Sequence, residues 1–345
     1  MIDIDGSRGE GGGQILRTSL ALSMLTGKAF AMRNIRAGRA KPGLRRQHVA
    51  CVEAAAQLCG ATVHGASVSS KYLEFTPGPI SARELAIDIG SAGAASLVVQ
   101  TILVPALVAG HPLRATIKGG THNPMAPPFE FLDRVFLPHL RAMGAAVTLT
   151  LDRYGFAPGD ARATEHGQLT LTVDTSVLRP IELVEVGEVR ARRVTVLSSR
   201  LPTHVAEREL KVVRERLPGQ LEVDVRDVRA PAIGNVLMIE LERAGGVELI
   251  TSFGAKGKRA ELVAEEACTN ACAFLDANVP VGEHLADQLL LPMAIAGGGR
   301  YRCAPLSLHA TTNIVTIQQF LDLPIEVATH RDAVLVSVGS ATLSA

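Results

Sequence analysis

A repeat with a period of about 83 residues constrains the fold of this chain more than any other feature. Two stretches share one pattern, a small-residue entry, an apolar helix that ends at glycine and a short strand: residues 12–38 and 93–120. Their helix-ending glycines, Gly27 and Gly110, are 83 residues apart, and the glycines that end the next helix, Gly60 and Gly144, are 84 apart. Such regular spacing predicts a repeated βαβαββ-type unit.

A third copy of the pattern comes late in the chain, at residues 285–307, and its helix ends at Gly297. Gly297 lies 187 residues after Gly110, about 100 more than one period, so the spacing predicts an inserted segment. Within residues 187–275, some segments alternate apolar and polar residues as strands do, and others are amphipathic as surface helices are. These segments are enough to form a small α+β unit of their own. We therefore predict a three-repeat domain, residues 1–186 and 276–345, interrupted by a small domain at 187–275.

Composition narrows the class of protein. A formal net charge of +1 argues against a protein that binds nucleic acid or an anionic membrane through its overall electrostatic field. Any anionic partner must therefore bind a local basic patch. The five cysteines form no CxxC or CxxH spacing, which favours a reduced intracellular protein without a zinc site. The longest apolar stretch, SLVVQTILVPALVAG, is short and interrupted by Gln100. We expect a cytoplasmic protein with no membrane partner.

The opening loop RGEGGGQILRTS, residues 8–19, is the first candidate binding site. A glycine-rich turn that leads into a helix exposes backbone N–H groups and the positive end of the helix dipole, both suited to an anion. The loop lacks the lysine of a P-loop and the preceding context of a dinucleotide-binding fingerprint. A tight turn that merely needs glycine is the alternative interpretation.

A basic run beside this loop strengthens the anion interpretation. Residues 11–52 contain no Asp or Glu but carry eight cations: Arg17, Lys28, Arg33, Arg36, Arg39, Lys41, Arg45 and Arg46. A solvated basic face is the common explanation of a charge run, but such faces usually mix signs. The run therefore favours a phosphate-rich ligand, and Glu10 stands where a divalent metal that bridges phosphates needs an oxygen ligand.

Six blocks carry a family resemblance: GEGGGQILR (9–17), RAGRAKPGLRRQH (36–48), GSAGAASLVVQT (90–101), GGTHNPMAPP (119–128), HVAERE (204–209) and EHLADQLLLPMA (283–294). In this order, over essentially the whole chain, they resemble RNA 3′-terminal phosphate cyclases. The resemblance implies an α+β fold of three units like the C-terminal domain of initiation factor 3. It also implies a small thioredoxin-like domain inserted before the third unit.

The resemblance implies an ATP-dependent enzyme that also needs a divalent cation, Mg or Mn. Its partner is an RNA with a 3′-phosphate end, which becomes a 2′,3′-cyclic phosphate. A histidine takes AMP from ATP as a covalent histidine–AMP, the AMP passes to the RNA 3′-phosphate to give RNA(3′)pp(5′)A, and the 2′-hydroxyl displaces it. Adenylation supplies the leaving group that a phosphate monoester lacks.

The resemblance assigns site residues one by one. The family's nucleophile matches His309 in LSLHATTNI. Without the resemblance, a histidine in this mostly apolar segment would be interpreted as a packed or helix-capping residue. Glu10 matches the metal-linked glutamate, while Arg17, Arg39 and Gln47 match residues that handle phosphates. The nucleotide positions are Gln100, Pro127, His284, Leu285, Ala286, Asp287 and Gln288.

Two positions depart from the family pattern. His284 stands where a tyrosine commonly stacks on adenine, and an imidazole offers a smaller stacking area. Asp160 lies where the family continues in glycines. The remaining histidines fall in no metal-ligand spacing, and His122 in the GGTHNP block is the one of these that we single out.

Two other classes of protein stay open at this point. One is a non-catalytic, cyclase-like ribosome-assembly protein, which would lack the nucleophilic histidine, and the presence of His309 disfavours it. The other is an enolpyruvyl-transferase-like phosphate enzyme, which would need no adenylated intermediate.

Overall fold

The computed structural model of the chain describes residues 1–157, 166–330 and 332–339. Asp160 lies outside these ranges. In these ranges helices and strands are mixed throughout, and the strands form four separate four-stranded sheets, so the predicted α+β class is confirmed.

The first sheet is built by the N-terminal part of the chain: β1 (Ile2–Asp5), α1 (Gln14–Thr26), β2 (Phe30–Arg33), α2 (Arg46–Cys59), β3 (Thr62–His64) and β4 (Leu73–Thr76). Its strand order is β1-β2-β4-β3, with β1 parallel to β2 and the other pairs antiparallel. The parallel pair needs the crossover helix α1, and this helix brings the glycine-rich loop to its own N-terminus.

The second sheet repeats this arrangement with β5 (Glu84–Asp88), α3 (Ala95–Leu107), β6 (Leu113–Gly119), the helical segments α4 (Phe129–Phe131), η1 (Leu132–Phe136) and α5 (Leu137–Ala142), β7 (Val147–Arg153) and β8 (Gly167–Val173). Its order, β5-β6-β8-β7, has the same parallel and antiparallel pairs in the same places.

The third sheet combines segments from both sides of the insert: β9 (Ile181–Leu183), α8 (Glu283–Ile295), β14 (Gly299–Cys303), α9 (Leu308–Phe320), β15 (Ile325–His330) and β16 (Ala333–Val338). Its order is β15-β16-β14-β9, and β9 pairs in parallel with β14, Ile181 opposite Gly299. The insertion therefore follows the first strand of this unit. The expectation that it comes before the third unit was wrong, because a three-residue strand carries little sequence signal.

The segment predicted as an insert forms the strands and helices of a small α+β unit: β10 (Val189–Ser199), α6 (His204–Arg216), β11 (Glu222–Asp227), β12 (Gly234–Arg243), β13 (Gly246–Phe253) and α7 (Ala260–Ala277). The strand order is β11-β10-β12-β13, with β10 and β11 parallel. Its apolar side chains form a core of their own, from Val194 to Ala271, in which α6 and α7 cover one face of the sheet.

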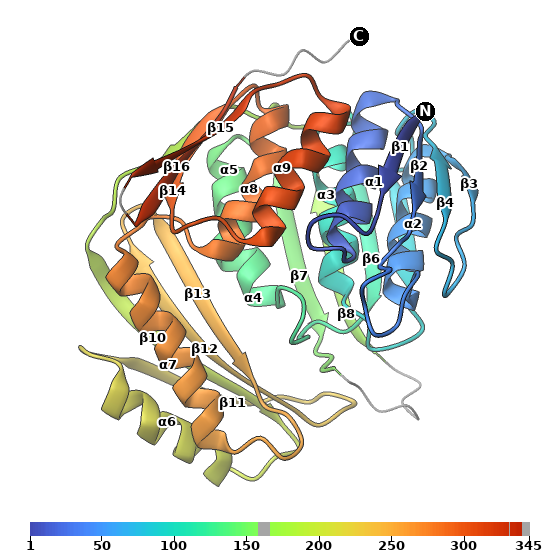
Figure 1. The fold of residues 1–345 in the computed structure, drawn as a ribbon. Helices are drawn as coiled ribbons and strands as arrows, with labels where there is room; N and C mark the ends of the chain where they lie inside the picture. Colours follow the sequence, from blue (N-terminus) through green and yellow to red (C-terminus); the bar gives the residue numbers. More distant parts are fainter. Residues whose placement is uncertain (158–165, 331, 340–345) are drawn as a thin grey trace.

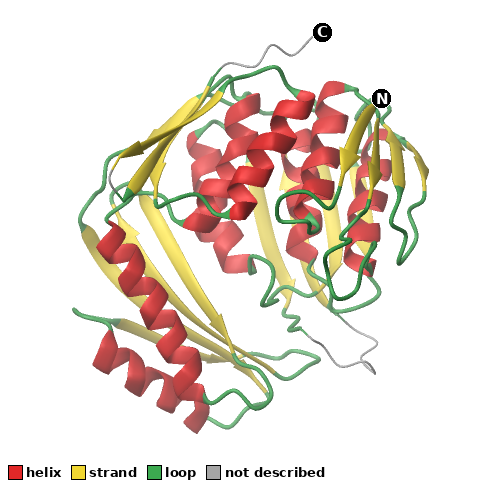
Figure 2. Cartoon of the chain, in the orientation of Figure 1, coloured by secondary structure: helices red, strands yellow, loops and turns green. Residues whose placement is uncertain are grey.

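The three sheets of the rest of the chain, called the body here, surround a central group of helices (Figures 1 and 2). Helix α1 contacts α3 on one side and α9 on another. Helix α3 is apolar on nearly every side and almost wholly buried, as expected for a central helix. In Figure 1 the N-terminal ends of α1 and α9 lie at the lower end of the helix group, which faces the insert.

The landmark glycines of the repeat have a common backbone conformation. All are in the left-handed region, with φ between 62° and 104°: Gly27, Gly60, Gly110, Gly144 and Gly297. Gly27 caps α1 directly, since its N–H donates to the Ser23 carbonyl at 2.9 Å. Left-handed residues at helix ends favour glycine, and this explains why the period is visible in the sequence.

Candidate active site

His309 lies in the first turn of α9, where two loops meet. The Ser307 side chain accepts a hydrogen bond from the Ala310 N–H at 3.3 Å and so sets the start of the helix. The His309 side chain is 53% exposed, and its Nδ1 lies 2.6 Å from Oε1 of Gln14, the first residue of α1. Nδ1 of this imidazole is therefore held by a contact within the body, while the Nε2 side of the ring stays accessible.

The Gln14 amide determines the tautomer of His309. Its Nε2 donates to Oδ1 of Asp287, and a carboxylate can only accept, so its Oε1 faces the imidazole. Nδ1 of His309 must then donate to this oxygen, and the lone pair of the neutral ring sits on Nε2. Burial lowers the pKa of His309 below its usual value, while Asp287 opposes this shift. The site thus presents a neutral imidazole whose lone pair lies on the accessible Nε2.

Asp287 is held by a buried amide on α9. Asn313 donates from Nδ2 to the Asp287 carboxylate and to its backbone carbonyl, both at 3.0 Å. The Asn313 oxygen in turn accepts from the Thr18 hydroxyl at 2.9 Å. Burial raises the pKa of Asp287, and the nearby His309 and the Gln14 and Asn313 amides lower it. Helices α1, α8 and α9 are joined through these side chains, which fixes the carboxylate in place.

Glu10 lies beside the accessible nitrogen of His309. Its Oε1 is 3.9 Å from His309 Nε2 and forms an ion pair with Arg39. Its backbone N–H donates to Oγ1 of Thr312 at 3.0 Å. Its Oε2 is buried and has no hydrogen-bond partner among the described residues. A buried carboxylate oxygen without a partner is costly, and it is available to a ligand.

Gly9 allows the opening loop to approach α9 this closely. Its φ is +57°, and a Cβ on it would lie 2.1 Å from Oγ1 of Thr312. A side chain there would push the loop away from the helix and break the Glu10–Thr312 hydrogen bond. The loop is therefore built to place Glu10 rather than only to turn the chain.

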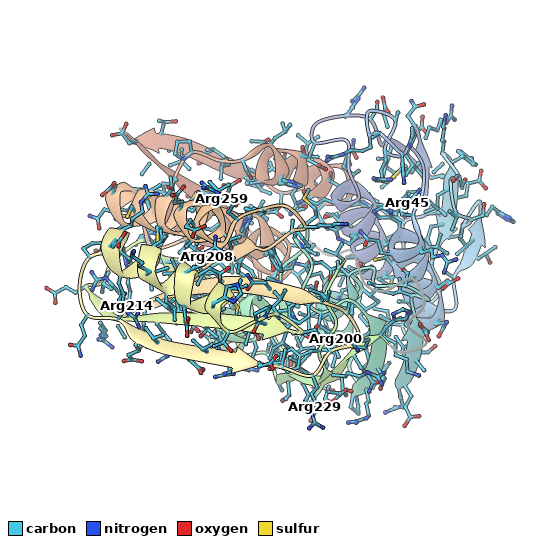
Figure 3. All side chains as sticks on the ribbon, turned by 90° about the horizontal axis from the view of Figure 1, so that it is seen from below. Arg45, Arg200, Arg208, Arg214, Arg229 and Arg259 are labelled. Atoms are coloured by element: carbon cyan, nitrogen blue, oxygen red, sulfur yellow. The ribbon has the colours of Figure 1, made fainter. Side chains whose placement is uncertain are left out.

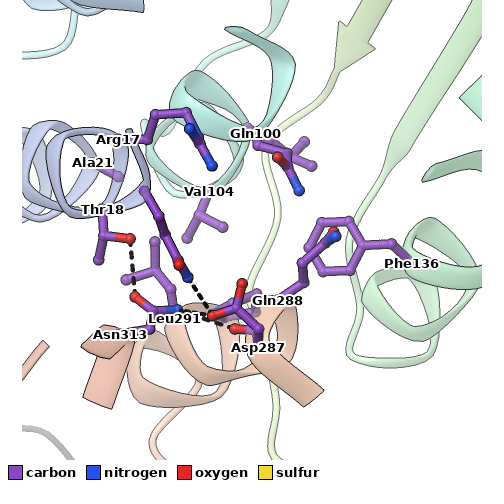
Figure 4. Close-up of a pocket in the computed structure, with 13 residues that line it drawn as sticks. Arg17, Thr18, Ala21, Gln100, Val104, Phe136, Asp287, Gln288, Leu291 and Asn313 are labelled. Atoms are coloured by element: carbon purple, nitrogen blue, oxygen red, sulfur yellow. Dashed lines mark hydrogen bonds between the residues drawn. The ribbon is translucent and has the colours of Figure 1, made fainter. Parts of the chain in front are cut away.

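A cavity continues from this cluster between α1, α3 and α8. Figure 4 shows Arg17 from α1, Gln100 from α3 and Gln288 from α8 around it, with Asp287 at one side. Apolar side chains complete the wall: Ala21, Leu103, Val104, Phe136, Leu291 and Pro292. Oε1 of Gln288 is buried without a partner among the described residues. Burial lowers the pKa of the Arg17 guanidinium, and Cys51 and Asp287 oppose this.

Comparison with known proteins identifies the family. The profile of the RNA 3′-terminal phosphate cyclase family matches residues 8–327. The chain belongs to this family. Curated proteins named RNA 3′-terminal phosphate cyclase are similar to it along nearly their whole length. The protein of Ectopseudomonas mendocina is 47% identical over 94% of both chains. That of Pseudomonas fluorescens is 45% identical, over 97% of this chain and 96% of the relative.

The cyclase family is a family of enzymes, so of the two alternatives considered from the sequence the non-catalytic one is not supported. A solved EPSP synthase from Acinetobacter baumannii aligns with 99% of this chain and 66% of its own, at 12% identity and a TM-score of 0.33. Those values are too low to support a shared fold with that enzyme.

Most residues that the cyclase resemblance singled out come together. Glu10, Arg39 and His309 form one cluster, while Arg17, Gln100, Asp287 and Gln288 line the adjoining cavity. Gln47 lies on α2, and its Oε1 accepts from the Ala94 N–H, just before α3, at 3.2 Å. Within the body, Gln47 thus holds the loop that precedes α3.

Four predicted nucleotide residues lie apart from the cavity wall. The side chains of Leu285 and Ala286 are each 1% exposed and pack in the core, and the Ala286 carbonyl accepts from the Tyr301 hydroxyl at 2.8 Å. His284 is exposed, with its ring edge-on to Phe131 at 6.3 Å. Pro127 lies in the loop between β6 and α4.

The basic run does not form a single phosphate patch. Two of its members pair with carboxylates, Arg33 with Asp3 and Arg39 with Glu10. Three bind backbone carbonyls: Lys28 that of Phe320, Arg36 those of Lys41 and Gly43, and Arg46 that of Gly90. Much of the basic run therefore stabilises the fold. The local sequence does not show this, because the partners are carboxylates outside residues 11–52 and backbone carbonyls.

Sequence reasoning overlooked Gln14, Thr18 and Asn313. All three are polar and buried, on helices whose buried side chains are mostly apolar or small hydroxyl residues. A buried amide needs a partner, so polar residues on apolar faces were a usable signal. His122 is explained differently, since it is fully buried, bonded to Glu130 at 2.9 Å and stacked on Tyr154.

In the described part of the chain, no group of three or more His, Cys, Asp or Glu side chains could hold a metal by itself. A cation at Glu10 would therefore need further ligands from its substrate or from water. Among the same residues, no helix has both the length and the apolar character needed to cross a membrane.

Proposed function

We propose that this enzyme uses ATP to convert a terminal RNA 3′-phosphate into a 2′,3′-cyclic phosphate, through a covalent His309–AMP and an RNA(3′)pp(5′)A intermediate. The observation that carries the proposal is the state of His309. Its Nδ1 is engaged by Gln14, its Nε2 holds the lone pair, and that nitrogen faces Glu10 and Arg39. A neutral, oriented imidazole beside charged groups suits attack on a phosphorus atom.

In the first step Nε2 of His309 forms a bond to the α-phosphorus of ATP, and the bond to the bridging oxygen breaks to release pyrophosphate. The proton on Nδ1 stays on the hydrogen bond to Gln14, which supports the positive charge on the ring. A 3′-phosphate oxygen of the RNA then displaces His309 from the AMP. In the last step the 2′-hydroxyl gives its proton to solvent, its oxygen bonds to the 3′-phosphorus, and the bond from that phosphorus to the bridging oxygen breaks to release AMP.

The residues around His309 suit a hard divalent cation, Mg or Mn. Oε2 of Glu10 is a buried carboxylate oxygen without a partner, which is the type of ligand these ions prefer. When bound, the cation supplies positive charge that neutralises phosphate oxygens. Arg17 and Arg39 supply fixed charge to the same phosphates, and guanidinium groups suit bidentate contacts.

We assign the cavity to the nucleoside part of ATP. Gln288 brings a buried, unpartnered amide oxygen, and Gln100 brings a second amide across from it. His284 and Pro127 lie outside the cavity wall, and we assign them to the part of adenine that extends beyond the cavity. Leu285 and Ala286 are assigned to the packing that positions their neighbours. Asp287 acts as a positioning residue through Gln14.

The finer architecture and location are part of the same proposal. The three sheets with equal strand order are units like the C-terminal domain of initiation factor 3, and the insert at 187–275 is a thioredoxin-like domain between two parts of a larger one, 1–186 and 276–345. The five free cysteines suit the cytoplasm.

Incubation with ATP labelled at the α-phosphate and a divalent cation tests the proposal. A phosphoramidate at His309 gives a protein-bound label that is labile to acid and stable to base. A chase with 3′-phosphorylated RNA must then move the label to RNA and release AMP as the cyclic end forms. Cyclisation without a protein-bound label would contradict the histidine–AMP step.

A further inference from the structure

Three loops of the insert meet at one edge of its sheet. Strands β10 and β11 are parallel and end there, β12 starts there, and β13 ends there, with Ser199 opposite Gly234 and Val236 opposite Phe253. The loops at residues 200–203, 228–233 and 254–259 are therefore neighbours, at the lower right of the insert in Figure 1.

These loops carry only positive charge. They contain no Asp or Glu and five cations, of which Lys258 pairs with Glu266. The other four are exposed and have no ion-pair partner among the described residues; we call them the cationic edge: Arg200, Arg229, Lys256 and Arg259. Figure 3 shows Arg200 and Arg229 at the end of the insert nearest the body.

Other arginines of the insert behave differently. Arg208 forms two hydrogen bonds of 2.7 Å to Glu261, Arg226 pairs with Asp224, and Arg193 pairs with Glu222 and Glu240. These three cations of the sheet and of α6 are thus neutralised, whereas the four cations of the edge have no ion pair among the described residues. Unpaired cations on one edge create a local positive potential that attracts a polyanion.

The cationic edge is attached to the body beside the proposed nucleotide site. The Phe156 ring packs on Gly234, where a Cβ would lie 2.0 Å from the ring. Phe156 also packs on His122, with ring centroids 5.2 Å apart. His122 belongs to the 119–128 block, which carries Pro127. The cationic edge therefore lies at the end of the insert that adjoins the body, next to the block whose Pro127 we assign to adenine.

We propose that the cationic edge binds phosphates of the RNA strand on the 5′ side of the reacting end, a role that rests on the proposed function. The four cations offer charge to successive phosphates of a single strand. The three loops contain no aromatic residue on which a base could stack, so the contact is independent of RNA sequence. The insert then serves to retain long RNA while the end reacts in the body.

The test compares two triple variants with equal loss of charge. Arg200→Ala/Arg229→Ala/Arg259→Ala removes three members of the edge. Lys211→Ala/Arg214→Ala/Arg216→Ala removes three exposed cations from the other end of α6. Both are compared with wild type on a 3′-phosphorylated RNA of about 20 nucleotides and on a 3′-phosphorylated dinucleotide, together with ATP-dependent protein labelling.

We expect the edge variant to bind the long RNA on the order of tenfold more weakly at low salt, and to lose about 2 from the slope of log K against log salt, since each single-strand contact contributes about 0.7. Labelling by ATP and turnover of the dinucleotide should stay at the wild-type level in both variants. The α6 variant should also keep wild-type affinity for the long RNA. Arg→Lys replacements at the same three edge positions should restore binding.

Equal affinity and salt slope in the edge variant and wild type would overturn the proposal, as would an equal loss in the two triple variants. These results differ from failure of the proposed function, in which wild type itself would neither take up the label nor cyclise the dinucleotide. Melting curves of each variant identify any loss of binding that comes from unfolding.

Discussion

Nδ1 of His309 and Oε1 of Gln14 lie 2.6 Å apart, although the two residues are separated by 295 positions in the chain. Because the other end of the Gln14 amide donates to Asp287, the contact has one direction, from imidazole to amide oxygen. A single glutamine thus links a buried carboxylate to the nitrogen that we assign as nucleophile. The predictions below begin with this link.

The first prediction concerns His309 itself. His309→Ala should abolish both protein labelling by α-labelled ATP and cyclisation of a 3′-phosphate, because no other residue takes the AMP. A pre-adenylated RNA(3′)pp(5′)A end should still close, since that step needs no histidine–AMP. The free energy of unfolding of the variant should lie within about 0.5 kcal/mol of that of wild type, because the side chain is half exposed. Labelling that persists in the variant would remove His309 from the mechanism.

The second prediction concerns Asp287→Asn. The new amide can donate to Gln14, so Gln14 can turn its nitrogen toward His309 and hold the wrong tautomer. We expect the labelling rate to fall about 100-fold with ATP affinity changed far less. Since Asp287 raises the pKa of His309, its loss should also move the acid limb of the rate to lower pH. An unchanged pH profile would show that Asp287 acts only on packing.

The third prediction separates Glu10 from Arg17. Glu10→Ala removes an oxygen ligand for a hard cation, so labelling should fall and recover in part at high divalent concentration through mass action. Arg17→Ala removes fixed charge, and we expect a loss of about 100-fold that added metal does not restore. Arg39 is less informative, because it pairs with Glu10 and its loss also frees that carboxylate. Wild-type labelling in both variants would make the opening loop a structural turn.

The fourth prediction concerns His284, which we assign to the part of adenine that extends beyond the cavity. His284→Tyr should tighten ATP binding and His284→Ala should weaken it, each within about 0.5–1.5 kcal/mol, the range of an aromatic stack. Calorimetry with a non-hydrolysable ATP analogue measures both. Equal affinities in all three proteins would place His284 away from the base. His204, exposed on the insert, supplies the matched histidine for a control substitution.

The fifth prediction concerns Glu209, fully buried on α6, whose Oε1 accepts from Asn235. Burial raises the pKa of Glu209 from 4.5 to about 7, against the effects of Asn235 and Lys258. The folded state therefore holds the proton more tightly, and its stability falls as pH rises between these two values. Glu209→Gln keeps the acceptor but cannot ionise. It should reduce the loss of unfolding free energy between pH 5 and 8 by up to about 3 kcal/mol.

Denaturant unfolding at the two pH values tests this, with Glu207→Gln, exposed on the same helix, as the control. An equal pH dependence in wild type and in Glu209→Gln would mean that Glu209 titrates near its usual value in the folded protein. Glu248, whose pKa burial raises to about 8, leaves part of the dependence in every variant.

The sequence by itself determined the features that depend on local conformation. The helix-ending glycines marked the period because each needs a left-handed backbone. The excess of about 100 residues before Gly297 revealed the insert, and alternation within it predicted its strands and helices. The motif blocks then indicated the family and the residues Glu10, Arg17 and His309.

Only the tertiary structure decided how distant residues combine. It assigned β9 to the third sheet through pairing with β14, and it made Gln14 the partner of both Asp287 and His309. It also paired Arg39 with Glu10, which the acid-free local sequence had left without a counter-charge. The hydrogen bond from the Glu10 N–H to Thr312 joins residues that are 302 positions apart. A local pattern records which backbone a segment favours, whereas a buried polar group takes whichever partner the packing of separate helices brings to it.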